Sequence, residues 1–235
     1  MTVVDALNGC FISFEGVEGG GKSTQSRLLA DRVAGLGYDV ISTREPGGTE
    51  LGEVARALTR KPAIFRRFHR VLTGVDWKAT DPLAELFLMS AARAQLVGQV
   101  LLPALSRGSV VICDRFDDST LAYQGYGRGL DLETLRAVNA IATRGLRPAL
   151  TVLIDLPVEA GLLRKRAEVG RDAIGDEALP FHERIRAGYI SLATAEPTRW
   201  LVVDGMQPPE LVAERIWERV APLLSPIPPN TERAE

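Results

Sequence analysis

A glycine-rich loop near the start of the chain carries the first residues that could do chemistry. The loop reads Gly16-Val17-Glu18-Gly19-Gly20-Gly21-Lys22-Ser23-Thr24 and directly follows an apolar run. It fits the pattern G-x-x-x-x-G-K-[ST], in which backbone N–H groups converge on a phosphate at a helix N-terminus. Lys22 is then expected to reach the β- and γ-phosphates, and Ser23 to hold a magnesium ion. The loop therefore predicts a nucleotide-binding site, but it does not indicate which reaction the bound phosphate undergoes.

A carboxylate and a guanidinium stand side by side after a second apolar run. Residues 110–113 predict a buried strand, and Asp114 and Arg115 follow at its carboxyl end, the edge where open α/β sheets bind ligands. Asp114 is suited to orient the magnesium shell, and Arg115 to grip the phosphate of an acceptor. The alternative is an ion pair that only supports the strand end. A guanine-nucleotide switch protein is disfavoured, because the chain contains no Asn-Lys-x-Asp sequence.

Four sequence blocks together resemble the bacterial thymidylate kinase family, in the family's own order. They are the glycine-rich loop with its strand end (14–24), TREPGGT over 43–49, AARAQ over 91–95 and DRFDDSTLAYQG over 114–125. The resemblance implies the P-loop NTPase fold and phosphorylation of dTMP to dTDP, in dTTP biosynthesis, with ATP and Mg²⁺. It also implies a homodimer, and a loop over 204–207 that packs on the adenine.

The resemblance also assigns roles on the acceptor side. Glu18 is similar to the family's carboxylate for the sugar 3′-hydroxyl, and Arg56 and Arg115 to the residues that bind the acceptor phosphate. Arg93 matches the arginine that reads the thymine edge. Tyr123 matches the tyrosine that crowds the sugar 2′-position and so favours deoxyribose.

Two further features complete the expected acceptor pocket. Thr120 and Gln124 line it, by the same resemblance. Met89 stands where the family commonly stacks a phenylalanine on thymine, and a thioether covers a ring less selectively. Kinases for another deoxynucleoside monophosphate, such as dUMP or dCMP, therefore remain an alternative.

A basic segment over about 163–178 corresponds to the family's lid. Arg164 and Arg166 match the family's basic run, whereas Glu168 and Ala173 stand where further arginines are usual. Some members of the family carry an arginine immediately after the P-loop acid, but here Gly19 and Gly20 follow Glu18, so the P-loop offers no arginine for the transferring phosphoryl group. Arg166 and Arg171 are the candidates to supply it, each with a solvated basic helix face as the alternative.

The elements that position these residues alternate between short apolar runs and longer helical patterns, which is typical of a parallel sheet with helices on both faces. Five strands are expected, over 10–15, 40–43, 110–113, 150–155 and 200–203. Helices are expected over 22–36, 82–107, 131–144, 157–169 and 209–223, with Pro103 bending the second of them. The stretch 61–81 has mixed periodicity and permits no assignment.

Composition limits the remaining choices. The 235 residues suit a single domain over 1–224, followed by a disordered proline-containing tail over 225–235. A formal charge of -2 disfavours a nucleic-acid-binding surface. We expect no membrane span, because no apolar run approaches the roughly 20 residues that a bilayer requires. Cys10 and Cys113 favour free thiols in a reducing cytoplasm. From a different class of protein, a P-loop switch ATPase with a macromolecular partner is the remaining alternative.

Overall fold

Five parallel strands form one sheet in the order β2-β3-β1-β4-β5. The computed structural model describes residues 7–60, 70–71, 74, 80–169 and 179–224. The strands are β1 (Cys10–Glu15), β2 (Val40–Arg44), β3 (Val110–Asp114), β4 (Leu150–Asp155) and β5 (Trp200–Asp204). All five predicted strands are confirmed to within one residue at either end. In the pairing of β1 with β3, Phe14 lies opposite Asp114, so the two strands end side by side. The P-loop, which follows β1, and the Asp114-Arg115 pair are therefore neighbours.

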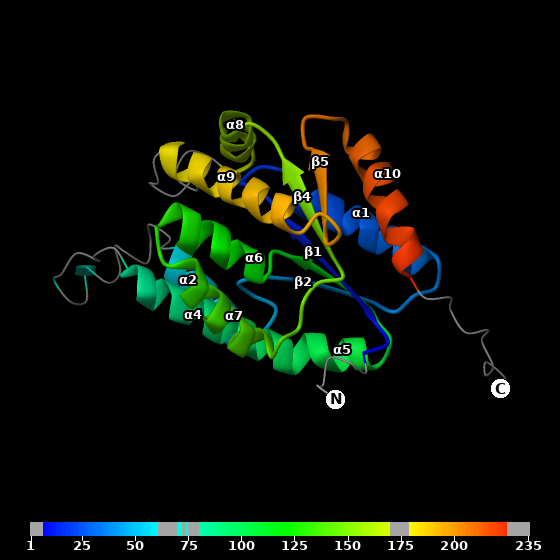
Figure 1. The fold of residues 1–235 in the computed structure, drawn as a ribbon, viewed down its shortest axis with the longest axis horizontal. Helices are drawn as coiled ribbons and strands as arrows, with labels where there is room; N and C mark the ends of the chain where they lie inside the picture. Colours follow the sequence, from blue (N-terminus) through cyan, green and yellow to red (C-terminus); the bar gives the residue numbers. More distant parts are fainter. Residues whose placement is uncertain (1–6, 61–69, 72–73, 75–79, 170–178, 225–235) are drawn as a thin grey trace.

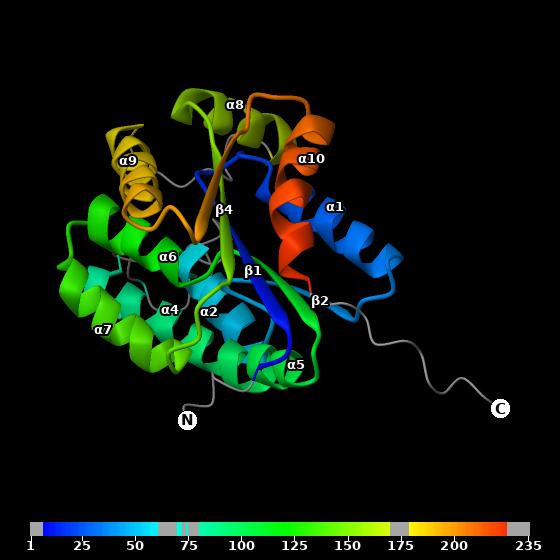
Figure 2. The ribbon, with the colours of Figure 1, turned by 45° about the vertical axis from the view of Figure 1, so that its right-hand side comes forward.

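Helices cover both faces of this sheet, as predicted (Figures 1 and 2). Ile12 and Phe14 of β1 pack toward α1 and α10, whereas Phe11 packs with the helices of the opposite layer. This alternation follows from the period of two in a strand, and it buries β1 on both faces from Phe11 to Glu15. The helical segments are α1 (Lys22–Gly35), α2 (Glu50–Arg60), α4 (Pro82–Leu96), η2 (Val97–Leu101), α5 (Leu102–Ser106), α6 (Asp117–Thr120), η3 (Leu121–Gly127), α7 (Leu132–Thr143), α8 (Val158–Val169), α9 (Leu179–Ala195), α10 (Pro209–Val220) and η5 (Ala221–Leu223).

The long helix over residues 82–106 differs from the expectation in two ways. Its interior contains the π-helical turn η2, just before Pro103, whose missing N–H disturbs the regular ladder. In addition, its 25 residues are long and apolar enough to cross a membrane by length and composition alone. The expectation that no apolar run approaches that length was therefore wrong. Leu86, Leu96 and Leu101 are buried in the core, which accounts for the apolar composition without a bilayer.

The helix α9 was missed from the sequence. Its buried side includes His182 and Gly188 beside apolar residues, so the apolar stripe is interrupted. The short helices α6 and η3 within residues 117–127 were also missed, because polar residues and glycines dominate that segment. The predicted tail (225–235), the part of the lid over 170–178 and most of 61–81 lie outside the described residues.

Both cysteines are free thiols, as the sequence predicted. Cys113 is fully buried in β3, whereas Cys10 is only partly buried. Burial raises the pKa of both, to about 11 for Cys10. These thiols are therefore protonated at neutral pH and are poor nucleophiles.

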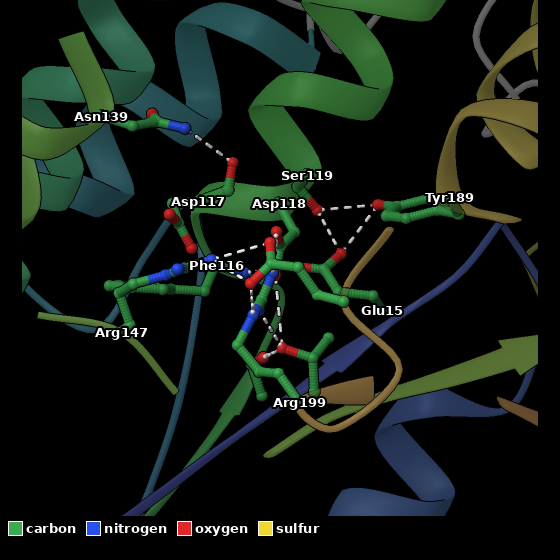
Figure 3. A network of polar contacts seen from close by, with 12 residues as sticks. Glu15, Phe116, Asp117, Asp118, Ser119, Asn139, Arg147, Tyr189 and Arg199 are labelled. Carbon is green, nitrogen blue, oxygen red and sulfur yellow. Dashed lines mark hydrogen bonds and ion pairs between the residues drawn. The ribbon is translucent and has the colours of Figure 1, made fainter. Parts of the chain in front are cut away.

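A buried ion pair fastens α6 to the edge of the sheet (Figure 3). Arg199 donates from Nη1 to Asp118 Oδ2 at 2.6 Å and from Nη2 to Oδ1 at 3.0 Å. Only 2% of the Asp118 side chain is exposed. Arg199 also donates to Thr151 Oγ1 at 2.7 Å, so strand β4 joins the same contact. The pair fixes the segment that carries the fourth sequence block, residues 114–125.

We expect Asp118→Ala to lower the free energy of unfolding by about 3 kcal/mol, because it leaves a largely buried guanidinium without its main partner. Glu218→Ala is the matched control, since the Glu218–Arg215 pair is exposed on α10 and such pairs contribute about 0–1 kcal/mol. Urea titration of both variants measures the difference. Equal losses would mean that burial of the pair has no bearing on stability.

Candidate active site

The glycine-rich loop joins β1 to α1 at the carboxyl edge of the sheet. Gly19 has a φ of 68°, and a Cβ at this position would collide with the carbonyl oxygen of Gly161 in α8. Gly21 caps α1 without any side-chain hydrogen bond, so the first N–H groups of that helix have no side-chain acceptor at the cap. The loop is therefore shaped to receive an anion, and α8 lies directly against it.

The side chain of Lys22 curls over the loop. Its Nζ donates to the carbonyl oxygens of Gly16 at 3.0 Å and Val17 at 2.8 Å. Burial, with a further contribution from the charge of Arg115, lowers the pKa of Lys22 to about 8, although nearby Glu18 and Asp114 oppose the change. A polyphosphate in the loop would offer this ammonium a stronger partner than two carbonyl groups.

Ser23 and Asp114 meet where α1 begins and β3 ends. The Ser23 hydroxyl donates to Asp114 Oδ2 at 2.6 Å. Hydroxyl and carboxylate oxygens are ligands that Mg²⁺ accepts, so these two residues fit such an ion. No group of three His, Cys, Asp or Glu side chains suited to a metal occurs among the described residues. Mg²⁺ in proteins is usually held by one or two carboxylates and takes its other ligands from phosphate and water.

Arg115 stands beside the loop, on the turn after β3. Its Nη2 donates to Glu18 Oε1 at 3.0 Å and to the Tyr123 hydroxyl at 3.0 Å, and its Nη1 donates to the Tyr189 hydroxyl at 3.1 Å. The guanidinium also lies over the ring of Tyr123, with Cζ 5.0 Å from the centroid. A cation is thus held rigidly next to the nucleotide loop.

A cleft of about 210 Å³ opens from this point between the P-loop, α4 and η3. Seven of the eight predicted acceptor-side residues line it, namely Glu18, Met89, Arg93, Arg115, Thr120, Tyr123 and Gln124. Arg56 of α2 does not line the cleft and donates instead to the carbonyl oxygen of Pro46 at 3.1 Å. A larger cavity, about 730 Å³, lies at the amino edge of the sheet around Gly9 and Tyr38. We place the site in the smaller cleft, because the charged groups converge there.

Arg93 is buried at the inner end of the cleft. It donates from Nε to Glu45 at 2.8 Å, from Nη1 to Thr120 at 2.9 Å and Asn139 at 2.8 Å, and from Nη2 to the Phe116 carbonyl at 3.2 Å. These contacts use four of the five N–H groups of a guanidinium. One N–H on Nη2 is left to meet a ligand.

Gln124 is oriented by a neighbouring carboxylate. Its Nε2 donates to Glu85 Oε1 at 2.7 Å, and Arg128 pairs with the same carboxylate at 3.2 Å. Because an ionised carboxylate only accepts hydrogen bonds, the amide nitrogen must face Glu85. The carbonyl oxygen of Gln124 is then left as an acceptor for a ligand.

Several residues of the site were not identified from the sequence. Glu45 lies within the TREPGGT block, so its motif was a signal that could have been used. Glu85 and Asn139 had no such signal, because their spacing looks like that of ordinary helix residues. Tyr189 lies on the missed helix α9. The candidate lid residue Arg166 is exposed on α8, and Arg171 lies outside the described residues.

A P-loop on a five-stranded parallel sheet of this strand order defines the class of P-loop nucleotide-binding proteins. Sequence comparison narrows the class, since the family described as Thymidylate kinase matches residues 14–216. The chain belongs to the thymidylate kinase family. It is 49% identical to the thymidylate kinase of Synechococcus sp. (strain JA-2-3B'a(2-13)), over 91% of this chain and 95% of the relative. It is 47% identical to that of Thermomicrobium roseum, over the same shares of the two chains.

The structure resembles a solved member of the same family. The crystal structure of thymidylate kinase from Ehrlichia chaffeensis matches with a TM-score of 0.68 and 30% sequence identity. The match covers 90% of this chain and 98% of the other. The P-loop NTPase fold predicted from the sequence is thereby confirmed.

We expect ATP binding to be accompanied by proton uptake near pH 8. In the free protein the pKa of Lys22 is about 8, below its ordinary value of 10.5, so part of the population is neutral there. The triphosphate favours the charged form and raises this pKa, so protons are taken up on binding. Calorimetry at pH 8.3 in two buffers of different ionisation enthalpy measures the uptake.

Lys22→Arg provides the control, because a guanidinium stays charged at this pH. The variant should take up no proton through this position. Equal uptake by both proteins would assign the titration to another group.

Proposed function

We propose that this chain transfers the γ-phosphoryl group of ATP to dTMP, producing ADP and dTDP in the synthesis of dTTP. The observation that carries the proposal is the juxtaposition of the P-loop with Arg115. β1 and β3 are paired neighbours, and the loop and the arginine follow their ends. Two phosphates bound by these groups would lie next to each other, as direct transfer requires.

The donor side is formed by the P-loop and the start of α1. Backbone N–H groups of the loop bind the phosphates of ATP, and Lys22 contacts the β- and γ-phosphates. Ser23 and Asp114 would hold Mg²⁺, and their 2.6 Å contact supports this pairing. When bound, the ion neutralises charge on the β- and γ-phosphate oxygens.

The acceptor phosphate and sugar are bound at the mouth of the cleft. Arg115 binds the phosphate of dTMP together with Arg56 from α2, which in the free protein contacts the cleft-lining Pro46 and would have to turn toward the phosphate. Glu18 accepts the hydrogen bond of the 3′-hydroxyl. The 3.0 Å pair between Glu18 and Arg115 supports this arrangement, because it holds both side chains at one end of the cleft. Tyr123, which lies beside both, crowds the 2′-position and favours deoxyribose.

The inner cleft recognises the base by its pattern of donors and acceptors. The remaining N–H of Arg93 donates to the O4 acceptor of thymine, and the Gln124 carbonyl oxygen accepts the N3–H group. Cytosine presents an amino donor in place of O4 and an unprotonated N3. Both contacts would then be lost: the Arg93 N–H would face the amino donor of cytosine, and the Gln124 carbonyl oxygen would face its unprotonated N3. Thr120 and Met89 complete the walls of the cleft.

Transfer needs no covalent intermediate. An oxygen of the dTMP phosphate attacks the γ-phosphorus in line with the departing ADP oxygen, and one P–O bond forms as another breaks. Lys22 and Arg115 stabilise the charge on the transferring group, with further cations from the lid. The protein's contribution is alignment and preorganised positive charge.

We expect dTMP to be the best acceptor in a panel of dTMP, dUMP, dCMP and ribose TMP. dUMP should follow, because uracil has the same hydrogen-bonding edge but lacks the methyl group that fills the cleft. dCMP should be slower by about 10²-fold or more, since one lost polar contact with a charged group costs about 1.5–3 kcal/mol. ADP release with each acceptor measures the ranking.

ADP release that is independent of any acceptor would contradict the proposal. It would favour the alternative of a P-loop ATPase that acts on a macromolecular partner. A panel in which dCMP leads would keep the kinase but reverse the assignment of Arg93 and Gln124.

A further cation for the transferring phosphoryl group, an arginine, comes from the lid. Gly161 of α8 packs on the backbone of Glu18 in the P-loop, so the first turn of this helix lies beside the proposed phosphate site. Arg164 donates to the carbonyl oxygen of Gly205 at 2.9 Å, in the loop expected to cover adenine. Arg166 lies farther along α8, and Arg171 follows two residues after its end.

We expect Arg166→Ala or Arg171→Ala to lower kcat by about 10³-fold at saturating ATP and dTMP, because arginines of this kind stabilise transition-state charge. Arg215→Ala, on the exposed side of α10, is the control and should leave kcat unchanged. If Arg164→Ala, Arg166→Ala and Arg171→Ala all turn over within about threefold of the wild type, the lid does not supply this cation.

A homodimer is also part of the proposal. α2 and α4 contact each other and expose large apolar side chains, among them Leu51, Val54, Leu83 and Phe87. Phe87 is 62% exposed, which is costly for a residue that stays in water. These helices therefore offer a surface suited to a second copy of the chain.

A further inference from the structure

The backbone at Arg115 is held in an unfavourable conformation. Its φ is 74°, in the left-handed region that non-glycine residues rarely adopt. The N–H of Arg115 donates to the Phe14 carbonyl at 2.9 Å, and the Cys113 thiol donates to the Arg115 carbonyl at 3.0 Å. Such a conformation persists only where the surroundings hold it. The direction of the guanidinium therefore depends on those surroundings.

The main support is the carboxylate of Glu15, the last residue of β1. Glu15 is 0% exposed and accepts three hydrogen bonds, from the Phe116 N–H at 2.8 Å, the Ser119 hydroxyl at 2.6 Å and the Tyr189 hydroxyl at 2.7 Å. Burial raises the pKa of Glu15, while the charge of Arg115 and the hydrogen bonds oppose that rise. The carboxylate therefore fixes the residue directly after Arg115.

Tyr189 connects this carboxylate to the guanidinium itself. Figure 3 shows its hydroxyl, projecting from α9, in a triangle with Ser119 and Glu15. The hydroxyl has one proton, which it donates to Glu15, and its oxygen accepts from Arg115 Nη1 at 3.1 Å. The chain of contacts runs from a buried anion through a phenol to a cation.

The two ends of the guanidinium have different surroundings. Nη2 meets Glu18 and Tyr123, which line the cleft, whereas Nη1 meets Tyr189 at 3.1 Å and, more weakly at 3.4 Å, the cleft-lining Ser119. Tyr189 does not line the cleft and is only 1% exposed. Its hydroxyl therefore anchors the inner end of the guanidinium and leaves the other end to the ligand.

We infer that Tyr189 is a positioning residue for acceptor phosphorylation, acting through Arg115. Its hydroxyl, held by Glu15, fixes the direction in which Arg115 presents its N–H groups to the dTMP phosphate. The inference rests on the proposed role of Arg115 as a ligand of that phosphate. It gives α9, far from the P-loop in sequence, a part in aligning the acceptor.

Tyr189→Phe tests this role, because it removes only the hydroxyl oxygen of the side chain. Tyr189→Phe keeps the ring, which packs against Tyr123 and Trp200 with centroids 6.5 Å away in each case. kcat/KM for dTMP should fall about tenfold, with KM for ATP within twofold of the wild type. Tyr126→Phe is the matched control, because the Tyr126 hydroxyl donates to Ser191, also on α9, at an exposed position. That variant should match the wild type in both constants.

A double-mutant cycle with Arg115→Lys separates positioning from a purely structural role. If Tyr189 acts through the guanidinium, Tyr189→Phe should cost less than about twofold in the Arg115→Lys background. A tenfold loss in both backgrounds would overturn the inference, as would equal losses for dTMP and ATP. A Tyr189→Phe variant with wild-type kcat/KM for dTMP would overturn it as well.

Two controls keep the result unambiguous. Wild-type ADP release that does not depend on dTMP would mean that the proposed function fails, whereas dTMP-dependent release with an additive cycle means that only this inference fails. If Tyr189→Phe melts well below the wild type, the assays are repeated at 10 °C with folding checked by circular dichroism. Wild-type constants under those conditions overturn the inference too.

Discussion

One buried carboxylate, that of Glu15, sits where the two halves of the site meet. It ends β1 immediately before the P-loop, and its hydrogen bond to the Phe116 N–H fixes the turn after β3. The P-loop and Arg115, the arginine proposed to bind the acceptor phosphate, are thus tied to one anion at the end of the central strand. A buried carboxylate is costly unless it is fully hydrogen-bonded, and here three donors satisfy it.

The cationic side chains of the site are paired with other groups of the protein when no ligand is bound. The chain has a formal charge of -2, and in the free protein Lys22 donates to carbonyl groups, Arg93 pairs with Glu45 and Arg115 pairs with Glu18. Lys22 and Arg115 make contacts that a phosphate could replace with stronger ones. Arg93 differs, because four of its N–H groups are already used inside the protein. This difference supports the proposed roles, in which Lys22 and Arg115 bind phosphate and Arg93 reads a base edge.

The sequence predicted those parts of the fold and site whose signals are local. The P-loop, the five strands and the Asp114-Arg115 pair each lie within a short run of residues, so spacing alone indicates their structure. Contacts between distant segments could not be predicted in this way. Glu15 and Tyr189 are 174 positions apart, and Tyr189 lies on a helix whose apolar stripe is broken by His182 and Gly188. The orientation of Gln124 by Glu85 likewise depends on how α4 packs beside η3.

The hydrogen bonds of the Glu15 carboxylate place it to align the acceptor side of the proposed site. Glu15→Gln tests it most directly, because the amide keeps the shape but replaces one accepting oxygen with a donor. Calorimetric titration with dTMP, and separately with a non-hydrolysable ATP analogue, measures both dissociation constants. We expect dTMP binding to weaken at least tenfold, while binding of the ATP analogue changes less than threefold. Unchanged dTMP affinity, or an equal loss for both ligands in a folded variant, would contradict it.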